Sequence, residues 1–147
     1  RGDLGVKGLD AFAFYNNSAT DTPGTTGSTN DVTGERYGFA YNIGNVTVAA
    51  ERARTNAKTD LAITSDALGI SYAATKDLSV GYTHAKSKTG ASVTGASTYG
   101  DETIKMISVG YSLGAITTGV QFAKVANMGG YATSDGDAAL AYLRVGF

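Results

Sequence analysis

The sequence predicts an all-β protein whose antiparallel strands follow one another up and down, and three observations predict this fold. Large apolar residues alternate with small or polar ones along segments such as Ile116 to Phe122, which is the period-two pattern of a strand with two different faces. Short turns alternate with longer polar stretches along the chain. An aromatic residue, a tight turn and an alternating strand recur in that order, as expected for a chain built from hairpins.

The recurring hairpin pattern also relates the end of the chain to its interior. The three copies of the pattern are Tyr41 to Val48, Tyr72 to Val80 and Tyr111 to Thr118. The last three residues, Val145-Gly146-Phe147, match Val109-Gly110-Tyr111 before the third turn. We therefore expect four aromatic residues to mark one level of the sheet, where a membrane would have its interface with water. These residues are Tyr41, Tyr72, Tyr111 and Phe147.

Between the turns and the polar stretches, the sequence predicts eight strands. Their expected ranges are Leu9 to Asn16, Glu35 to Asn42, Asn45 to Arg54, Ala67 to Ala74, Asp77 to Lys86, Thr103 to Ser112, Ala115 to Lys124 and Asp137 to Phe147. The polar stretches that we expect to be long loops are Asn17 to Thr33, Thr55 to Asp66, Ser87 to Asp101 and Asn127 to Gly136. Most of the expected strands are close to the roughly 9 to 11 residues that a tilted membrane-crossing strand needs.

The expected strands have two unlike faces. One face is a continuous apolar band, and its charged members, Arg52, Lys86, Lys105 and Lys124, all fall near the long loops. The band consists of Tyr37, Phe39, Tyr41, Val46, Val48, Ala50, Leu68, Ile70, Tyr72, Leu78, Val80, Tyr82, Ile107, Val109, Tyr111, Ile116, Thr118, Val120 and Phe122. The other face is mainly Gly, Ala, Ser and Thr. A soluble sheet would carry many charges on its water-exposed face, so this pattern favours a transmembrane β-barrel with lipid outside.

The first expected strand does not fit this division into two faces. The face of Leu9 and Tyr15 also carries alanine, whereas the opposite face mixes Asp10 with Phe12 and Phe14. Neither face is clearly apolar or polar. We expect either a β-bulge or a contact at an interface to account for the mixture.

The composition excludes several function classes. The chain has 12 Lys and Arg against 13 Asp and Glu and no basic run that could follow phosphates, so we expect no nucleic-acid partner. No segment approaches the roughly 20 consecutive apolar residues of a membrane-spanning helix. Cysteine is absent and the single histidine, His84, falls on the apolar face, so we expect no metal site and no cofactor. No serine lies in a nucleophile motif, and we expect no enzymatic activity.

Three features carry a resemblance to a known family. They are the end of the chain, Ala141-Tyr142-Leu143-Arg144-Val145-Gly146-Phe147, the Val-Gly-aromatic triplets, and the alternating turns and loops. In these features the chain resembles a Gram-negative outer-membrane porin, and in particular the C-terminal eight strands of a general-diffusion porin. The resemblance implies an outer-membrane location, with short turns in the periplasm and long loops outside the cell. It also implies a homotrimer of 16-stranded barrels, set in a lipid bilayer with lipopolysaccharide, that passes small hydrophilic solutes and ions.

The small residues of the second face favour a larger barrel over a closed barrel of eight strands. An eight-stranded barrel has an interior just wide enough for side chains to fill, and Gly, Ser and Thr are too small to fill it. Residues 1–147 are therefore expected to form one β-barrel domain or the C-terminal half of one. The alternative is a small closed eight-stranded barrel with a structural or adhesive role and no usable pore, because eight is an even and sufficient number of strands.

Five larger polar side chains on the second face are expected to line the pore. They are Arg36, Glu51, Gln121, Tyr142 and Arg144. Wall charges of this kind set the ion preference of a channel, and pore width sets its size limit. Arg36 and Glu51 lie at similar heights on neighbouring strands, so we expect them to pair with each other. For Arg144 two expectations stay open: a bias of the channel toward anions, or a salt bridge to a carboxylate on a neighbouring strand.

Overall fold

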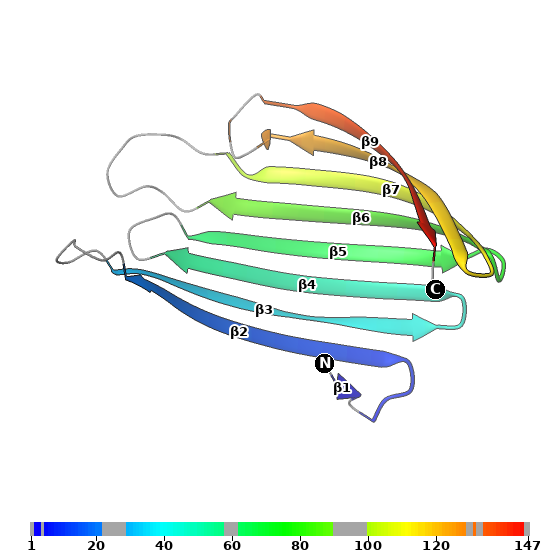
Figure 1. Ribbon diagram of the computed structural model, residues 1–147, viewed down its shortest axis with the longest axis horizontal. Coiled ribbons are helices and arrows are strands. Elements are labelled where there is room, and N and C mark those ends of the chain that lie inside the picture. Colours follow the sequence, from blue (N-terminus) through cyan, green and yellow to red (C-terminus); the bar gives the residue numbers. More distant parts are fainter. Residues whose placement is uncertain are drawn as a thin grey trace.

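The computed structural model describes residues 2–3, 5–21, 29–57, 62–89, 100–128, 131 and 134–145. Over these residues the chain forms a single antiparallel sheet and no α-helix (Figure 1). The strands are β1 (Gly2–Asp3), β2 (Leu9–Asp21), β3 (Thr29–Ile43), β4 (Val46–Ala57), β5 (Ile63–Ala73), β6 (Leu78–Thr89), β7 (Glu102–Leu113), β8 (Ile116–Ala126) and β9 (Gly136–Val145). No helix of this part of the chain has the length and hydropathy needed to cross a membrane.

The strands pair in the order in which they occur in the chain, and every pairing is antiparallel. This confirms the predicted all-β, up-and-down arrangement of eight strands, β2 to β9. The two-residue β1 adds only a short pairing beside the start of β2. Among the described residues β9 pairs with β8 alone, so the sheet is open between β2 and β9.

Several strands extend further toward the long loops than the sequence predicts. β2 reaches Asp21 and β3 begins at Thr29, so their ladder covers much of the expected loop from Asn17 to Thr33. β5 likewise begins at Ile63 rather than at Ala67. Asn, Ser, Thr and Asp are typical of turns because their side chains compete for backbone hydrogen bonds. Here the neighbouring strand supplies those bonds, and the polar residues remain extended.

The short turns have residues that suit tight hairpins. Gly44 begins the two-residue loop between β3 and β4, and Gly114 begins the one between β7 and β8. Each has a positive φ, 59° and 58° respectively, which glycine adopts at no steric cost. The turn between β5 and β6 uses Thr75 instead, whose Oγ1 accepts hydrogen bonds from two backbone N–H groups of the same turn.

The strand ends are staggered, so the strands are tilted relative to both edges of the sheet. One row of cross-strand partners starts at Leu9, the first residue of β2, and ends at Ala139, six residues before the last residue of β9. Toward the long loops, this row lies 12 residues from the end of β2 but three residues from the start of β9. From β2 to β9 the strand ends therefore shift by six residues at the short-turn edge and by nine residues, 12 minus 3, at the long-loop edge. With about 3.3 Å per residue and about 4.8 Å between strands, the tilt is about 30° at the short-turn edge and about 40° at the long-loop edge.

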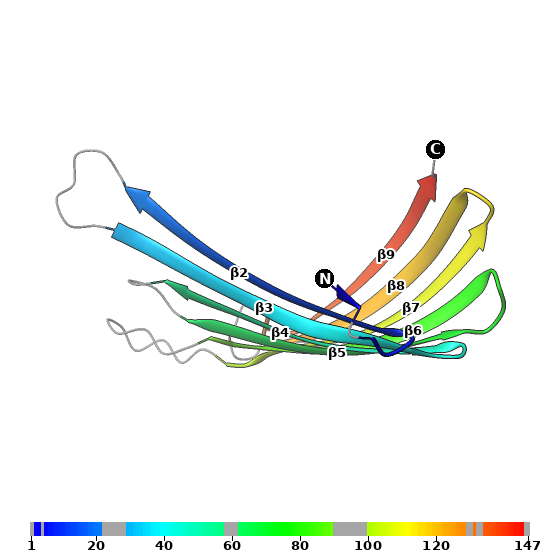
Figure 2. The same ribbon diagram turned by 90° about the horizontal axis from the view of Figure 1, so that it is seen from below.

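The sheet is a single curved layer, which Figure 2 shows as an open trough. None of the described residues is a buried hydrophobic residue, so the sheet has no core of its own. Along β8 exposed residues alternate strictly with partly covered ones, and the exposed set includes Ile116, Val120 and Phe122. Side chains spread apart on a convex face and converge on a concave one, which assigns the exposed set to the convex face. The register places the whole predicted apolar band on that face.

The β-bulge expected in the first strand is absent, and that prediction is wrong. All 13 residues of β2 pair with β3 in one continuous register. Leu9 and Tyr15 therefore lie on the convex face, and Phe12 and Phe14 lie on the concave face. Phe12 covers a glycine there, because a Cβ at Gly38 would lie 3.0 Å from Phe12 Cζ. The phenylalanine fills space that its glycine neighbour leaves empty. The expected interface contact stays a prediction.

An ion pair joins the long-loop end of β6 to the residue just before β7. Lys86 Nζ lies 2.7 Å from Asp101 Oδ2. The hydrogen bond from Lys86 lowers the pKa of the Asp101 carboxyl below its ordinary value of 3.8, against partial desolvation, and Lys88 adds a weaker attraction. A carboxyl with a lowered folded-state pKa stabilises the fold above its unfolded-state pKa, and this contribution is lost as the pH falls through the folded-state value.

We expect the Asp101 carboxyl to titrate below 3.8 in the folded protein and the K86Q variant to bring its pKa back toward that value. The stability difference between wild type and K86Q should also shrink as the pH falls below about 4. NMR titration of the side-chain carboxyl carbon measures the pKa directly. K76Q, which removes a lysine from an exposed short turn, is the matched control and should leave Asp101 unchanged. Identical Asp101 titrations in wild type and K86Q would contradict the ion pair.

Candidate functional site

The concave face carries all five residues that the sequence predicts to line a pore. The register places Arg36 and Glu51 on β3 and β4, and Gln121, Tyr142 and Arg144 on β8 and β9. Between these two groups β5, β6 and the short-turn half of β7 present mainly small side chains, whereas the long-loop half of β7 presents Ile104 and Met106. The small residues are Ala67, Gly69, Ser71, Ser79, Gly81, Thr83, Ser108 and Gly110. The candidate site is therefore a wide strip of small residues with a polar group on each side.

Arg36 and Glu51 form a diagonal ion pair across β3 and β4. Arg36 is directly opposite Ala53 and Glu51 is directly opposite Gly38, yet Arg36 Nη2 reaches Glu51 Oε2 at 2.6 Å. This confirms the expected pairing of the two side chains. The Arg36 Cζ atom also lies 5.9 Å from the centre of the Phe12 ring, within range of a cation–π contact. The side chains are 57% and 30% exposed, so the pair faces solvent and contributes little to stability.

Tyr142 lies across two glycines rather than projecting away from the sheet. A Cβ at Gly119, its cross-strand partner, would lie 2.5 Å from the Tyr142 hydroxyl oxygen, and a Cβ at Gly110 would lie 3.5 Å from it. Gly110 and Gly119 are themselves cross-strand partners. The ring therefore spans from β9 over β8 toward β7, and glycine at both positions is what lets it lie flat against the sheet.

Arg144 lies near the short-turn end of the same face, opposite Thr117. No described carboxylate lies within 4.0 Å of its guanidinium, so the salt bridge considered from the sequence has no partner in this part of the chain. Gln121 is opposite Ser108 on one side and Leu140 on the other. This side of the concave face thus presents a cation, an amide, a phenol and the exposed side chain of Leu140.

Sequence reasoning missed the hydrogen-bonded pairs of polar side chains that cross the strands on the concave face. Each pair consists of direct cross-strand partners, which period-two patterning alone does not identify, because it gives faces but not register. The pairs are Ser65 with Ser87 at 2.7 Å, Ser112 with Thr117 at 3.3 Å, and Thr47, which donates to Asn42 Oδ1 at 2.6 Å. The concave face therefore offers water a series of neutral donors and acceptors between its charged groups.

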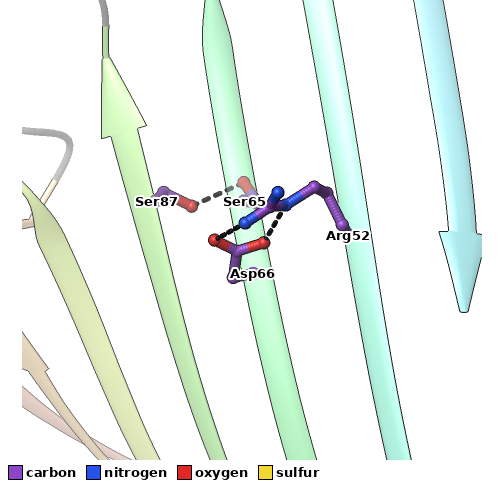
Figure 3. Close-up of polar contacts among 4 residues, drawn as sticks. All are labelled: Arg52, Ser65, Asp66 and Ser87. Atoms are coloured by element: carbon purple, nitrogen blue, oxygen red, sulfur yellow. Dashed lines mark hydrogen bonds and ion pairs between the residues drawn. The ribbon is translucent and has the colours of Figure 1, made fainter.

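Consecutive residues of β5 show how sharply the two faces differ. Ser65 pairs with Ser87 on the concave face, whereas Asp66 receives two hydrogen bonds from Arg52 on the convex face (Figure 3). The Arg52 Nε and Nη2 atoms lie 2.5 and 2.9 Å from the two carboxylate oxygens. In this bidentate ion pair the two charges neutralise each other at the long-loop end of an otherwise apolar face.

Three of the four expected interface aromatics lie on the convex face as well. Tyr41, Tyr72 and Tyr111 are all in the last three residues of their strands, close to the short turns. Phe147 lies outside the described residues. His84 is on the convex face, opposite Leu68 and Lys105.

The described side chains form no arrangement with obvious catalytic or metal-binding chemistry. Within them no group of three or more His, Asp or Glu residues is placed to hold a metal ion. The serines of β5 to β7 are on the concave face, whereas His84 is on the convex face, so these residues cannot form a nucleophile and base pair. What the concave face can do is contact water and polar solutes through weak, exchangeable hydrogen bonds.

The chain matches no protein-family model, no curated protein and no solved structure. The function of the concave face, with its small central strip and its two polar groups, is therefore inferred from its own geometry.

Proposed function

We propose that this sheet is part of the wall of a water-filled porin channel in a bacterial outer membrane, through which small hydrophilic solutes and ions diffuse passively. The observation that carries the proposal is a single layer with an apolar convex face, a small and polar concave face, and no core in its described residues. Such a sheet cannot cover its apolar face by itself. Lipid against the convex face and water against the concave face suit both faces at once.

The extent of the apolar face supports lipid as its environment. Phe122 is 58% exposed, and Leu68 and Ile107 are each 56% exposed. Apolar residues of this kind follow one another across neighbouring strands from β3 to β8, whereas soluble monomers rarely expose contiguous apolar patches above a few hundred Å². The ion pair of Arg52 with Asp66 lies at the long-loop border of this band, where lipid headgroups would surround it.

The tilt and the open edges of the sheet support a barrel. The tilt of about 30° to 40° derived from the strand offsets overlaps the 35° to 45° typical of membrane barrels. In hydrocarbon, unpaired N–H and C=O groups along β2 and β9 would each cost several kcal/mol, so both edges need partner strands. Since β2 and β9 do not pair with each other in the described sheet, further strands between them would complete the wall.

The concave face supports a pore of useful width. Small residues dominate its centre, and Tyr142 lies flat over Gly119 instead of projecting from the wall. Both features leave space in front of the sheet, as a wall along water requires. Passage of solutes along such a wall needs no cofactor and no catalytic group, and we propose no enzymatic activity. A periplasmic position of the short turns, extracellular long loops and a homotrimer are parts of the proposal that rest on the resemblance to general-diffusion porins.

One observation favours a second candidate function. β2 and β9 run in opposite directions, so they could form an antiparallel pair if the sheet curled further. That closure would give a small eight-stranded barrel with a structural or adhesive role. Its narrow interior would have to be filled by the small residues of the concave face, which makes it the weaker candidate.

Reconstitution of the full-length protein into planar lipid bilayers tests the proposed channel. We expect stepwise increases in ion conductance, because each inserted barrel adds one water-filled path. Resistance of the protein to added protease, measured in vesicles of the same lipid, verifies insertion independently of conductance. Protein that inserts but carries no current would exclude the channel and support the closed barrel.

The assignment of the two faces is tested by two neighbouring arginine substitutions. V109R places a charge in the middle of the convex apolar band, between Val80 and Val120, and should lower the free energy of unfolding in lipid by about 2 to 4 kcal/mol. S108R places the same side chain on the concave face and should cost about 1 kcal/mol or less. Denaturant titration in lipid vesicles measures both values. A larger loss for S108R than for V109R would mean that the faces are reversed.

Charge removal at the Arg36 and Glu51 pair should shift ion selectivity in opposite directions. E51Q leaves the Arg36 guanidinium uncompensated and should favour anions, whereas R36Q should favour cations, each by about twofold or less in permeability ratio because water screens the wall. Reversal potentials in a salt gradient measure the ratio. R54Q, which removes a cation from the convex face, is the control and should leave the ratio unchanged. Equal shifts in all three variants would exclude a lumenal position for the pair.

A further inference from the structure

The convex face contains a hollow in which apolar, cationic and polar surfaces follow one another in three successive rows. The apolar row consists of the cross-strand partners Tyr82, Ile107, Phe122 and Ala139. The small side chain of Ala139, next to Phe122, leaves an open hollow of about 560 Å³ along this row. That volume falls within the range of about 300 to 1,000 Å³ typical of small-molecule sites.

The next row toward the long loops carries two lysines side by side. Lys105 and Lys124 are direct cross-strand partners, with His84 on one side of them and Asp137 on the other. Like charges placed directly opposite each other destabilise a sheet. Among the described residues neither lysine has a carboxylate within 4.0 Å, Asp137 included. The row therefore has two cations and one carboxylate, none of which forms an ion pair with another described residue.

A second, polar hollow begins where the lysines end. It has a volume of about 490 Å³ and is lined by the same two lysines together with Thr103, Ala126 and two aspartates, Asp135 and Asp137. The Asp135 carboxylate is already engaged, because its Oδ1 accepts a hydrogen bond from the backbone N–H of Asn127 at 3.1 Å. Lys105 and Lys124 thus stand at the junction of an apolar hollow and a polar one.

A comparable hollow elsewhere on the convex face shows what distinguishes this one. The hollow beside Ala50 has a volume of about 300 Å³ and is also bordered by a cation at its long-loop end. That cation, Arg52, forms a bidentate ion pair with Asp66. At the hollow beside Ala139, Lys124 also has an aspartate, Asp137, as its cross-strand partner, but no described carboxylate lies within 4.0 Å of Lys124 or Lys105, so both ammonium groups are available to a ligand.

We propose that the hollow beside Ala139 binds a membrane lipid with an anionic phosphate headgroup. One acyl chain lies along Tyr82, Ile107, Phe122 and Ala139, the phosphate lies between Lys105 and Lys124, and the rest of the headgroup occupies the polar hollow. The charge of the lysines, the apolar row and their order along the strands each match one part of such a lipid. This inference rests on the proposed function, since it requires the convex face to be in contact with lipid.

The lipid that stays bound to the full-length protein after mild detergent extraction tests the site. The protein is reconstituted in vesicles of equal parts phosphatidylglycerol and phosphatidylcholine with identical acyl chains, extracted, and analysed by native mass spectrometry. We expect wild type to retain phosphatidylglycerol above its share in the vesicles. K105Q/K124Q should reduce this preference by about fivefold for each lysine removed, the ratio equivalent to about 1 kcal/mol per basic residue near an anionic lipid surface.

Two further variants separate the site from general charge attraction. K7Q/K76Q removes two lysines from the opposite, short-turn edge of the sheet and should keep the wild-type preference. A139F fills the apolar hollow while leaving Lys105 and Lys124 in place, and should lose retained lipid. An unchanged preference in K105Q/K124Q, an equal loss in K7Q/K76Q, or full retention in A139F would each overturn the site. If wild type inserts and conducts but shows no preference, the lipid site fails and the channel stands; if it does not insert, both fail.

Discussion

Hydrogen bonding between neighbouring strands is the interaction on which every other feature of this sheet depends. In most domains a hydrophobic core holds the secondary structure together, but the described residues here include no buried hydrophobic side chain. The continuous ladders from β2 to β9 are therefore what keeps the layer intact. Their strength depends on the surroundings, because a backbone hydrogen bond has little competition from water in hydrocarbon, and breaking one there leaves two groups without any partner.

The side chains are organised around that single layer. On the concave face two aromatic rings, Phe12 and Tyr142, lie against glycines of the neighbouring strands, so the bulk of these two rings is placed along the sheet, whereas Phe14 and Leu140 of the same face are exposed. On the convex face the large apolar residues project outward, and the ion pair of Arg52 with Asp66 lies on the long-loop side. The faces thus differ in polarity, one being mainly small and polar and the other apolar. Such a division would let one strand contact water on one side and lipid on the other.

Much of this arrangement could be predicted from the sequence, because period-two alternation determines which residues share a face. Arg36 and Glu51 were expected to pair for this reason, and they do. Strand ends were harder to predict. The polar residues after Asn16 resemble a loop by composition, yet the ladder between β2 and β3 continues through Asp21. Features that need the exact register were not predictable from alternation: the Ser65 and Ser87 pair, the position of Tyr142 over Gly119, and the adjacent Lys105 and Lys124.

The stagger of the strand ends has a consequence for the size of any complete barrel. The ends shift by roughly one residue for each strand added, and this shift, the shear, fixes the radius of a closed barrel once the strand number is chosen. With about 4.8 Å between strands and a tilt of about 35°, eight strands would close to a backbone diameter of about 15 Å, and 16 strands to about 30 Å. The narrower cylinder would be filled by ordinary side chains. The wider one would leave an open lumen in front of a wall whose central residues are Gly69, Gly81 and Gly110, so at one and the same local offset the number of strands decides between a filled interior and an open lumen.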